Sequence, residues 1–377
     1  MRSFWESQTW SESDVVIIGG GLIGMQTALE LASKRPGERV MVLERGLIPS
    51  GASTRNAGFA CIGSLSEVAA DIDLLGRDAA LDIVQMRFDG LNGLRSTCEG
   101  YDIGYLHHGG NEIFLEDHPS LERIVEINDL LSEVTGTTTF QLRSDLISAF
   151  GFADRVRHLV HSPIEGSLDS GKLVDVLWSK AQRAGVRIRT GAQVLGIEET
   201  SGGVNLTLRA GADEHLVKAG SAVIATNAWI PDLVKDHEAS RIVPARGQIL
   251  VTEPLAAMPL KGTYHFDEGY VYFRPVGNRI LLGGARNLAF EEEQTTSHDI
   301  TDLIQGALEA LLREVIAPSQ SNVSIDHRWS GTMAFSPSKH PIVERVSPHV
   351  VVAFGCNGMG VALSSSIAKR ITEVLKY

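Results

Sequence analysis

The chain has 377 residues, of which 43% are apolar and 21% are charged, a composition typical of a globular protein of about two domains. Its formal net charge of −12 disfavours nucleic acid and anionic membranes as main partners, because both favour a basic surface. The three cysteines are widely spaced, and the polar N-terminus precedes no apolar run of membrane-spanning length, so we expect a cytoplasmic protein without disulfides, zinc or a membrane span.

A βαβ unit is predicted at the N-terminus. Asp14 to Ile18 is a short run rich in β-branched residues, typical of a buried parallel strand, and a helical pattern follows it and ends near Gly37. Val40 to Leu43 predicts a second buried strand, which ends on the acidic residue Glu44.

The turn between this strand and helix carries a dinucleotide motif. Gly19, Gly21 and Gly24 fit GxGxxG, and Glu44 lies 20 residues beyond the last glycine (44 − 24). Glycines allow a pyrophosphate to approach the backbone, the helix N-terminus supplies free N–H groups, and the acid can accept hydrogen bonds from a ribose. The motif serves both NAD and FAD.

The middle of the chain adds further α/β material. Lys172 to Ala184 predicts a helix, and Val186 to Arg189 predicts a strand. Gln193 to Glu198 and Val204 to Arg209, joined through Ser-Gly-Gly, predict a hairpin, and Ala222 to Thr226 predicts another buried strand.

The next segment changes character. Gln248 to Thr252, Tyr270 to Arg274 and Arg279 to Leu282 predict strands of an antiparallel sheet. Near the end, the apolar run His349 to Phe354 is followed by GCNGMG and by a predicted helix from about Val361 to Lys376. The sequence thus predicts an α/β fold in which a strand-rich second domain is interleaved with a Rossmann-like one.

The motifs GGGLIG, GASTRNAG, SLDSGKLVDVL, ATNAW, PARGQ and GCNGMGVALSSSIAK come in the order seen in the D-amino-acid oxidase family, which includes glycine oxidase and sarcosine oxidase. The chain resembles this family over nearly its whole length, and most closely its γ-glutamylputrescine oxidase branch. The resemblance implies an FAD-binding domain from residues 12–85, 155–230 and 330–377, and a substrate domain with a large antiparallel sheet from residues 86–154 and 231–329.

The resemblance also implies which residues hold FAD. Relatives with covalent flavin carry a cysteine in the stretch that matches HRWSGTMAFSPSKHP, which has none, so FAD should be noncovalent. The implied cofactor-binding residues are Gly19, Gly21, Leu22, Ile23, Gly24, Glu44, Arg45, Ser53, Thr54, Arg55, Asn56, Ala57, Gly58, Val194, Thr226, Asn227, Trp229, Gly355, Asn357, Gly358, Met359, Gly360 and Val361.

Candidate substrate-binding residues come from two stretches. Tyr270, Tyr272 and Arg274 alternate on one face of a predicted strand and form either a substrate wall or a solvent-facing surface. In the stretch from His327 to Pro341, Trp329 and Met333 are candidate apolar walls of the substrate site. Glycine oxidase-like relatives carry a carboxylate-binding arginine where Met333 stands, so the resemblance favours amines or larger amino compounds over small amino acids.

The chemistry implied by the resemblance is hydride transfer to flavin from a carbon that bears a neutral amine, followed by hydrolysis of the imine. This requires orientation and a dry site, so we expect no catalytic base and no metal. Oxygen or an unknown acceptor would reoxidise the flavin. Two alternatives stay open: a flavoprotein subunit for assembly or electron relay in a larger complex, and an NAD-linked dehydrogenase.

Overall fold

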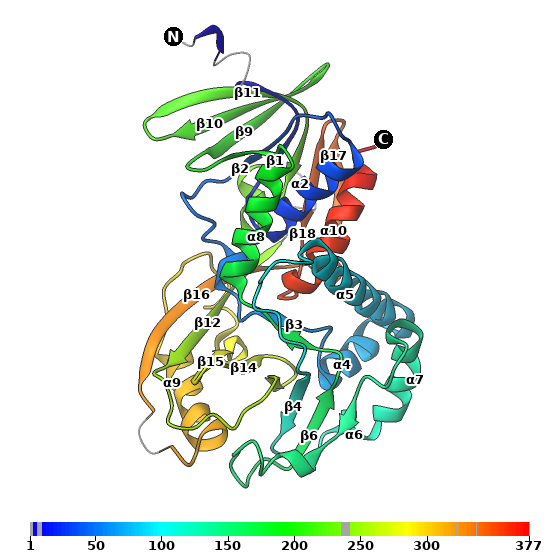
Figure 1. The fold of residues 1–377 in the computed structure, drawn as a ribbon, viewed down its shortest axis with the longest axis vertical. Coiled ribbons are helices and arrows are strands. Elements are labelled where there is room, and N and C mark those ends of the chain that lie inside the picture. The colour runs from blue at the N-terminus through cyan, green and yellow to red at the C-terminus, as the bar shows by residue number, and fades with distance from the viewer. Residues whose placement is uncertain (1–2, 6–9, 235–241, 321–322, 337, 377) are drawn as a thin grey trace.

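The computed structural model describes residues 3–5, 10–234, 242–320, 323–336 and 338–376. Two large sheets, each of eight strands, lie one above the other along the long axis of the molecule, and helices cover them (Figure 1). Stretches of the predicted domains at residues 235–241, 321–322 and 337 lie outside the described residues. Within the described part of the chain, no helix is long and apolar enough to cross a membrane.

The first sheet confirms the predicted α/β unit. Five of its strands run parallel in the order β18-β11-β1-β2-β8, and β17 pairs with β18 in the antiparallel direction. The predicted hairpin is also confirmed, and it pairs with the first half of β11. The strands are β1 (Glu12–Ile18), β2 (Val40–Leu43), β8 (Arg187–Arg189), β9 (Gln193–Thr200), β10 (Gly203–Ala210), β11 (Asp213–Ile224), β17 (Ile342–Ser347) and β18 (Val350–Phe354).

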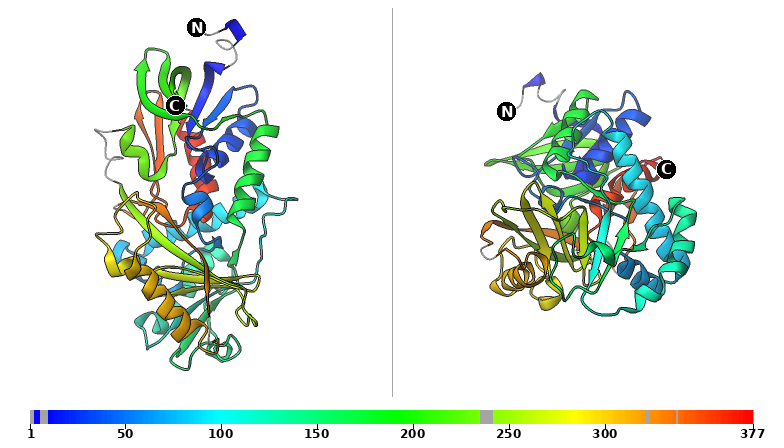
Figure 2. Two further views of the ribbon diagram at one scale, coloured as in Figure 1. Left: turned by 90° about the vertical axis from the view of Figure 1, so that its left-hand side faces the viewer. Right: turned by 60° about the horizontal axis from the view of Figure 1, so that its bottom comes forward.

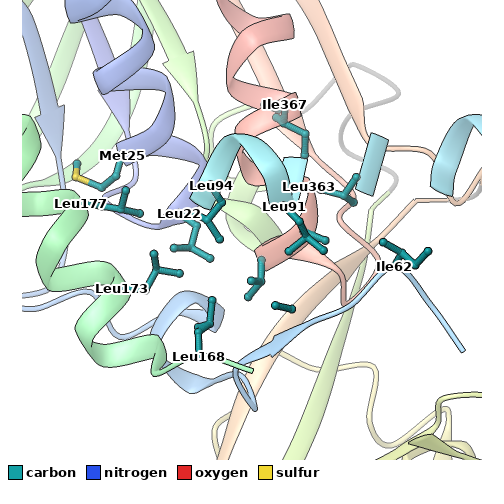
Figure 3. Packing of buried hydrophobic residues seen from close by; sticks show 14 of the residues in the cluster. Leu22, Met25, Ile62, Leu91, Leu94, Leu168, Leu173, Leu177, Leu363 and Ile367 are labelled. Carbon is teal, nitrogen blue, oxygen red and sulfur yellow. The ribbon is translucent and has the colours of Figure 1, made fainter. Parts of the chain in front are cut away.

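Four helices pack together beside this sheet: α2 (Leu22–Lys34), α5 (Arg77–Thr97), α8 (Ser170–Arg183) and α10 (Gly360–Val374). Figure 3 shows their apolar contacts, in which leucines of each helix meet and exclude water. Asp169 caps α8 by accepting a hydrogen bond from the Lys172 N–H at 3.0 Å. The core therefore fixes the N-termini of α2 and α10 next to the ends of β1 and β18.

The second sheet has the order β16-β12-β15-β14-β13-β4-β6-β5. Its neighbours are antiparallel except for the parallel pair β13–β4, so the predicted antiparallel character is confirmed with that one exception among the described strands. The strands are β4 (Gly110–Phe114), β5 (Gln141–Leu142), β6 (His158–Ser162), β12 (Val243–Thr252), β13 (Thr263–Phe266), β14 (Val271–Val276), β15 (Arg279–Gly284) and β16 (Ile325–Phe335).

Helix α9 (Asp302–Leu311) and the single turn η5 (Leu312–Ile316) cover one face of this sheet, as Figure 2 shows. Tyr264 and Phe273 stack in the core beneath them, with ring centroids 4.7 Å apart. On the side of β4 and β6 lie α4 (Leu65–Leu75), α6 (Pro119–Glu122) and α7 (Ile124–Thr135) (Figure 1).

Short elements link the two sheets. Helix α3 (Ala52–Arg55) leads into β3 (Phe59–Ala60), which pairs with β7 (Gly166–Ser167) in a small separate sheet. The remaining turns are η1 (Ser144–Leu146), η2 (Asn227–Asp232) and η4 (Arg286–Ala289).

The sheets divide the chain differently from the predicted domains at three points. The boundary at 85/86 falls inside α5, which packs on α10 beside the first sheet. Strand β6 pairs in the second sheet, although residues 155–230 were expected in the FAD domain. Strand β16 pairs with β12 along its whole length and so carries the second sheet on to residue 335. Hydrophobic periodicity gives no sign of which sheet a strand joins.

Candidate active site

A long cavity of about 430 Å³ runs from the carboxyl ends of β1 and β2 to the second sheet. Its volume lies in the range of small-molecule and cofactor sites. The wall combines the glycine-rich turn, the α3 segment, the end of β11, strands of the second sheet and the start of α10. Segments distant in sequence therefore meet around one space, at the end of the parallel strands where α/β sheets bind ligands.

The glycine-rich turn forms the first end of the cavity. Gly19, Gly21, Leu22 and Ile23 line it, whereas Gly24 does not. A Cβ atom at Gly24 would lie 1.9 Å from the Gly19 carbonyl oxygen, so this glycine allows α2 to pack close to the turn. The Leu22 N–H donates to Ser53 Oγ at 2.9 Å, which leaves later N–H groups of the first turn free for an anion.

Glu44 stands at the end of β2, as predicted, and is nine-tenths buried. Its Oε2 accepts from the Gly20 N–H at 2.9 Å and its Oε1 accepts from the Gly46 N–H at 2.8 Å. A carboxylate has about four acceptor positions, so each oxygen keeps one for a ribose hydroxyl. Beside it, the Arg45 guanidinium lies 4.0 Å from the centre of the Trp229 ring, and both residues line the cavity with Val194.

The predicted α3 segment and the end of β11 form the middle of the cavity. Arg55 Nη1 donates to the Ser330 carbonyl at 2.8 Å, and Asn227 Nδ2 donates to the Thr332 carbonyl at 2.8 Å, so both side chains tie the first sheet's loops to β16. Thr226 Oγ1 is buried at the cavity wall and has no hydrogen-bond partner among the described residues. An unpaired buried hydroxyl beside a cavity indicates a ligand that supplies its partner. Ser53, Asn56 and Ala57 also line this part.

The start of α10 closes the cavity on another side. Asn357, Gly358, Met359, Gly360 and Val361 line it. Asn357 Oδ1 accepts from the Ser336 N–H at 2.9 Å, which fixes the loop. The N-terminus of α10 therefore faces the cavity with its positive dipole end.

Four of the predicted cofactor residues lie outside the wall: Gly24, Thr54, Gly58 and Gly355. Thr54 Oγ1 donates to the Pro49 carbonyl at 2.7 Å, and a Cβ at Gly58 would lie 2.2 Å from the Leu168 carbonyl oxygen. These residues fix the conformation of segments whose neighbouring residues line the cavity. The position of a residue in a motif does not by itself show whether the residue lines the cavity or supports a neighbour that does.

The second sheet forms the other end of the cavity, and the substrate candidates Tyr270, Tyr272 and Met333 line it. A Cβ at Gly247 would lie 3.1 Å from Met333 Cε and 3.4 Å from Tyr272 Oη, so these side chains converge over Gly247. Met333 Sδ would lie 3.6 Å from a Cβ at Gly358. Met333 therefore lies between the loop before α10 and the tyrosines. Burial raises the pKa of Tyr272 to about 12.

Arg274 and Trp329 do not reach the cavity, contrary to prediction. Arg274 donates to the carbonyls of Ala57 at 2.5 Å and of Leu168 at 2.9 Å. Trp329 Nε1 donates to the Arg55 carbonyl at 3.0 Å. Arg274 lies on the predicted face of its strand, but farther along it than Tyr272, since a strand advances roughly 3.3 Å per residue. Both side chains support the α3 segment from beneath.

Sequence reasoning missed Arg286, which lines the cavity directly after β15. Its guanidinium carbon lies 4.3 Å from the centre of the Phe335 ring and 5.5 Å from that of Tyr270. Burial lowers its pKa, and it pairs with no carboxylate in the described part of the chain. The signal was present in LLGGAR, where a cation follows two glycines at a strand end. Arg246, the arginine of the PARGQ motif, instead forms a buried ion pair with Glu293 at 2.6 Å.

A group of buried titratable side chains lies beside the substrate end. Burial raises the pKa of Glu165 to about 8 and that of Glu112 to about 7, lowers that of His265 to about 4 and raises that of the Cys61 thiol. Cys61 and His265 line the cavity, together with the ion pair of Arg87 and Glu67 (3.0 Å). No spacing in the sequence connects these residues, because they come from separate elements.

The fold and the cavity define a dinucleotide-binding class of protein, in which one cavity reaches from a glycine-rich turn to a second sheet. The model of the family described as DAO, FAD dependent oxidoreductase, matches residues 14–374, and the chain belongs to this family. The protein is therefore an FAD-dependent oxidoreductase, as the resemblance implied.

Curated relatives agree. The chain is 26% identical to the probable oxidoreductase OrdL of Haemophilus influenzae and 26% identical to γ-glutamylputrescine oxidoreductase of Escherichia coli, in each case over 96% of this chain and 83% of the relative. It is 26% identical to glycine oxidase of Geobacillus kaustophilus over 78% of this chain and 75% of that enzyme.

Solved structures confirm the fold. L-proline dehydrogenase from P. horikoshii superposes with a TM-score of 0.80 at 19% identity, over 97% of this chain and 93% of that one. Glycine oxidase from Geobacillus kaustophilus gives a TM-score of 0.75 at 20% identity, over 97% and 95% of the two chains.

The residues present fit FAD. The glycine-rich turn and the N-terminus of α2 suit a pyrophosphate, and Glu44 keeps acceptor positions for a ribose. Farther along the cavity, the Thr226 hydroxyl has no hydrogen-bond partner among the described residues and can pair with the cofactor. The stretch that would carry a flavin-linking cysteine has Gly331, Thr332 and Met333 instead. FAD is the cofactor.

Proposed function

We propose that this enzyme oxidises the C–N bond of an amino compound to an imine, which water then hydrolyses. One observation carries the proposal: a single cavity joins the cofactor residues to an enclosed end formed by Tyr270, Tyr272, Met333 and Arg286. The names of the relatives, γ-glutamylputrescine oxidoreductase and glycine oxidase, support an amine or amino acid as substrate.

Arg286 supports a substrate that also carries an anionic group, most simply a carboxylate. The guanidinium is partly desolvated between Phe335 and Tyr270 and lacks a carboxylate partner among the described residues. A desolvated, unpaired cation at a ligand cavity binds an anion by charge-assisted hydrogen bonds. The absence of an arginine at position 333 therefore does not leave the substrate end without a cation, and the expected preference for amines over amino acids loses its main support.

The chain's own residues would orient the substrate and exclude water. FAD, held by the residues of the first end of the cavity, would supply the hydride acceptor for the carbon that bears the amine. Arg286 would hold the anionic end, and the side chains of Met333 and Tyr272 would enclose the reacting carbon over Gly247. The substrate amine must be neutral, so that its lone pair assists as the hydride leaves. We assign no catalytic base.

The electron acceptor and the cellular location belong to the same proposal. Oxygen or another acceptor reoxidises the flavin, and comparison of turnover in air with turnover under argon plus an artificial acceptor decides between them. We place the enzyme in the cytoplasm, supported by the free thiols Cys61, Cys98 and Cys356, since a reducing compartment keeps thiols unpaired. Recovery in a secreted or periplasmic fraction would contradict this.

Anaerobic reduction of the flavin tests the function. The purified enzyme is mixed without oxygen with amino acids, with the amines that lack the corresponding carboxylate, and with N-methyl amines, and the flavin absorption is followed. We expect bleaching by at least one compound with both an amine and a carboxylate, and weaker or no bleaching by its decarboxylated partner. If none of the compounds bleached the flavin, the electron-relay alternative would gain.

Arg286→Met tests the role of the cation. For a carboxylate-bearing substrate we expect kcat/KM to fall by roughly 10²-fold, in line with the loss of one desolvated charge pair. The matched amine without the carboxylate should change little, and Arg286→Lys should restore part of the loss. Equal losses for both members of the pair would show that Arg286 has a structural role only.

A further inference from the structure

Cys61, Glu165 and His265 come together from three elements that link the two sheets. Antiparallel pairing of β3 with β7 places Ala60 opposite Gly166, so the next residues along, Cys61 and Glu165, face each other. The Ile62 N–H donates to Glu165 Oε1 at 3.3 Å and holds this carboxylate in place. His265 comes from β13 of the second sheet.

One ligand-type atom of each side chain lies within 4.8 Å of the other two, and His265 Nε2 is 4.0 Å from Glu165 Oε2. Donor atoms that share a tetrahedral zinc-class ion lie roughly 3.3–3.6 Å apart, so small movements would complete the geometry. The three residues are only 2–6% exposed. His265 Nε2 is buried and has no hydrogen-bond partner among the described residues. It is directed towards Glu165.

The surrounding charges suit a divalent cation. The Glu67 carboxylate and the Arg87 guanidinium, 3.0 Å apart, cancel each other. Binding of the ion would release the protons of the Cys61 thiol and of Glu165, and the thiolate and carboxylate that result balance a doubly charged ion. Cysteine sulfur with a histidine nitrogen selects thiophilic metals such as Zn²⁺ over Mg²⁺ or Ca²⁺.

We propose that Cys61, Glu165 and His265 form a binding site for a thiophilic divalent cation of the zinc class. Cys61 and His265 line the cavity, so the fourth coordination position faces it and gives the ion its route of entry. The ion would join the β3 segment, the β6–β7 connection and β13, and so link the two sheets beside the substrate end. This site does not depend on the proposed function.

Cobalt substitution tests the site, because tetrahedral Co²⁺ with a thiolate ligand gives intense bands at wavelengths longer than those at which flavin absorbs. The FAD-containing enzyme is stripped with a chelator, titrated with Co²⁺, and followed by absorption and by thermal unfolding. We expect saturation at one equivalent and a higher unfolding temperature, since a ligand that binds only the folded state stabilises it. Zn²⁺ should displace the cobalt spectrum.

Three variants complete the test. Cys61→Ser and His265→Gln should each abolish the one-equivalent spectrum, whereas Cys98→Ser, which changes another buried thiol, should retain it. If either ligand variant failed to fold, the wild-type titration would still decide. Absence of a saturable cobalt spectrum in the wild type, or its persistence in a folded Cys61→Ser variant, would overturn the proposal.

Discussion

Residues of one motif serve different physical purposes at this site. Gly19 and Gly21 line the cavity, whereas Gly24 lies under the turn and lets α2 approach it. Glu44 likewise holds the turn through the Gly20 N–H as well as offering acceptors to a ribose. The sequence predicted the glycine-rich turn and the acid at the strand end, but not that Gly24 would lie under the turn and outside the cavity wall.

Gly24→Ala tests whether Gly24 is needed for the packing of α2 against the glycine-rich turn. The new methyl group would lie 1.9 Å from the Gly19 carbonyl oxygen, which belongs to the backbone and cannot move aside cheaply. We expect a loss of roughly 2–4 kcal/mol in unfolding free energy and loss of FAD on gel filtration. Gly306→Ala in α9, where a Cβ meets nothing within 4 Å, should instead be neutral or slightly stabilising. Retention of FAD and full stability in Gly24→Ala would contradict this role.

Tyr272 should not limit the reaction in alkaline solution. Burial raises the pKa of Tyr272 to about 12. The phenol therefore keeps its proton at roughly pH 8–10, the range in which the substrate ammonium loses a proton. We expect kcat/KM for flavin reduction to rise with pH and then level, without a fall below about pH 11. The profile of Tyr272→Phe should have the same shape. An alkaline fall that is present in the wild type and absent from Tyr272→Phe would contradict this.

At the scale of elements, periodicity predicted which side chains of β14 share a face, but not how far that face extends along the cavity, and it did not predict strand β16. Tyr272 and Arg274 share a face of β14, and Trp329 and Met333 share one of β16, yet only Tyr272 and Met333 line the cavity. The length of cavity that a strand borders depends on what packs across it. Here the α3 segment lies across both strands and takes Arg274 and Trp329 as its support.

Arg274→Met should therefore act on stability and cofactor retention. The change removes donors to the carbonyls of Ala57 and Leu168, two segments beside the cofactor end. We expect a loss of roughly 2–4 kcal/mol in urea unfolding and weaker FAD binding, with the substrate KM of the FAD-saturated enzyme little changed. Arg313→Met, at an exposed ion pair, should cost no more than about 1 kcal/mol. A selective rise in the substrate KM would instead indicate that Arg274 contacts the substrate.

At the scale of the molecule, the sequence predicted both sheets and the glycine-rich end of the cavity, because these features follow from local patterns of residues. It did not predict that Arg286 enters the cavity or that Cys61 and His265 meet Glu165, since such contacts depend on the packing of elements that lie far apart in sequence. Sheet membership of β6 and β16 was missed for the same reason.

A cofactor held between the two sheets should stabilise the whole fold. Removal of FAD should lower the unfolding temperature by several degrees, and FAD at about 100-fold its Kd should restore about 2.7 kcal/mol. NAD should not replace it. The flavin should appear in the supernatant after acid precipitation, because the stretch from His327 to Pro341 has no cysteine that could link it covalently. Stabilisation by NAD alone, or yellow colour in the pellet, would contradict the cofactor assignment.

The most direct test of C–N bond oxidation is a single turnover without oxygen. The FAD-containing enzyme is mixed with a primary amine or amino acid that bleaches it, and reduced flavin, carbonyl product and ammonia are measured in the same sample. We predict one carbonyl and one ammonia for each flavin reduced, because the imine hydrolyses. Reduced flavin without ammonia release would show that another bond of the substrate is oxidised.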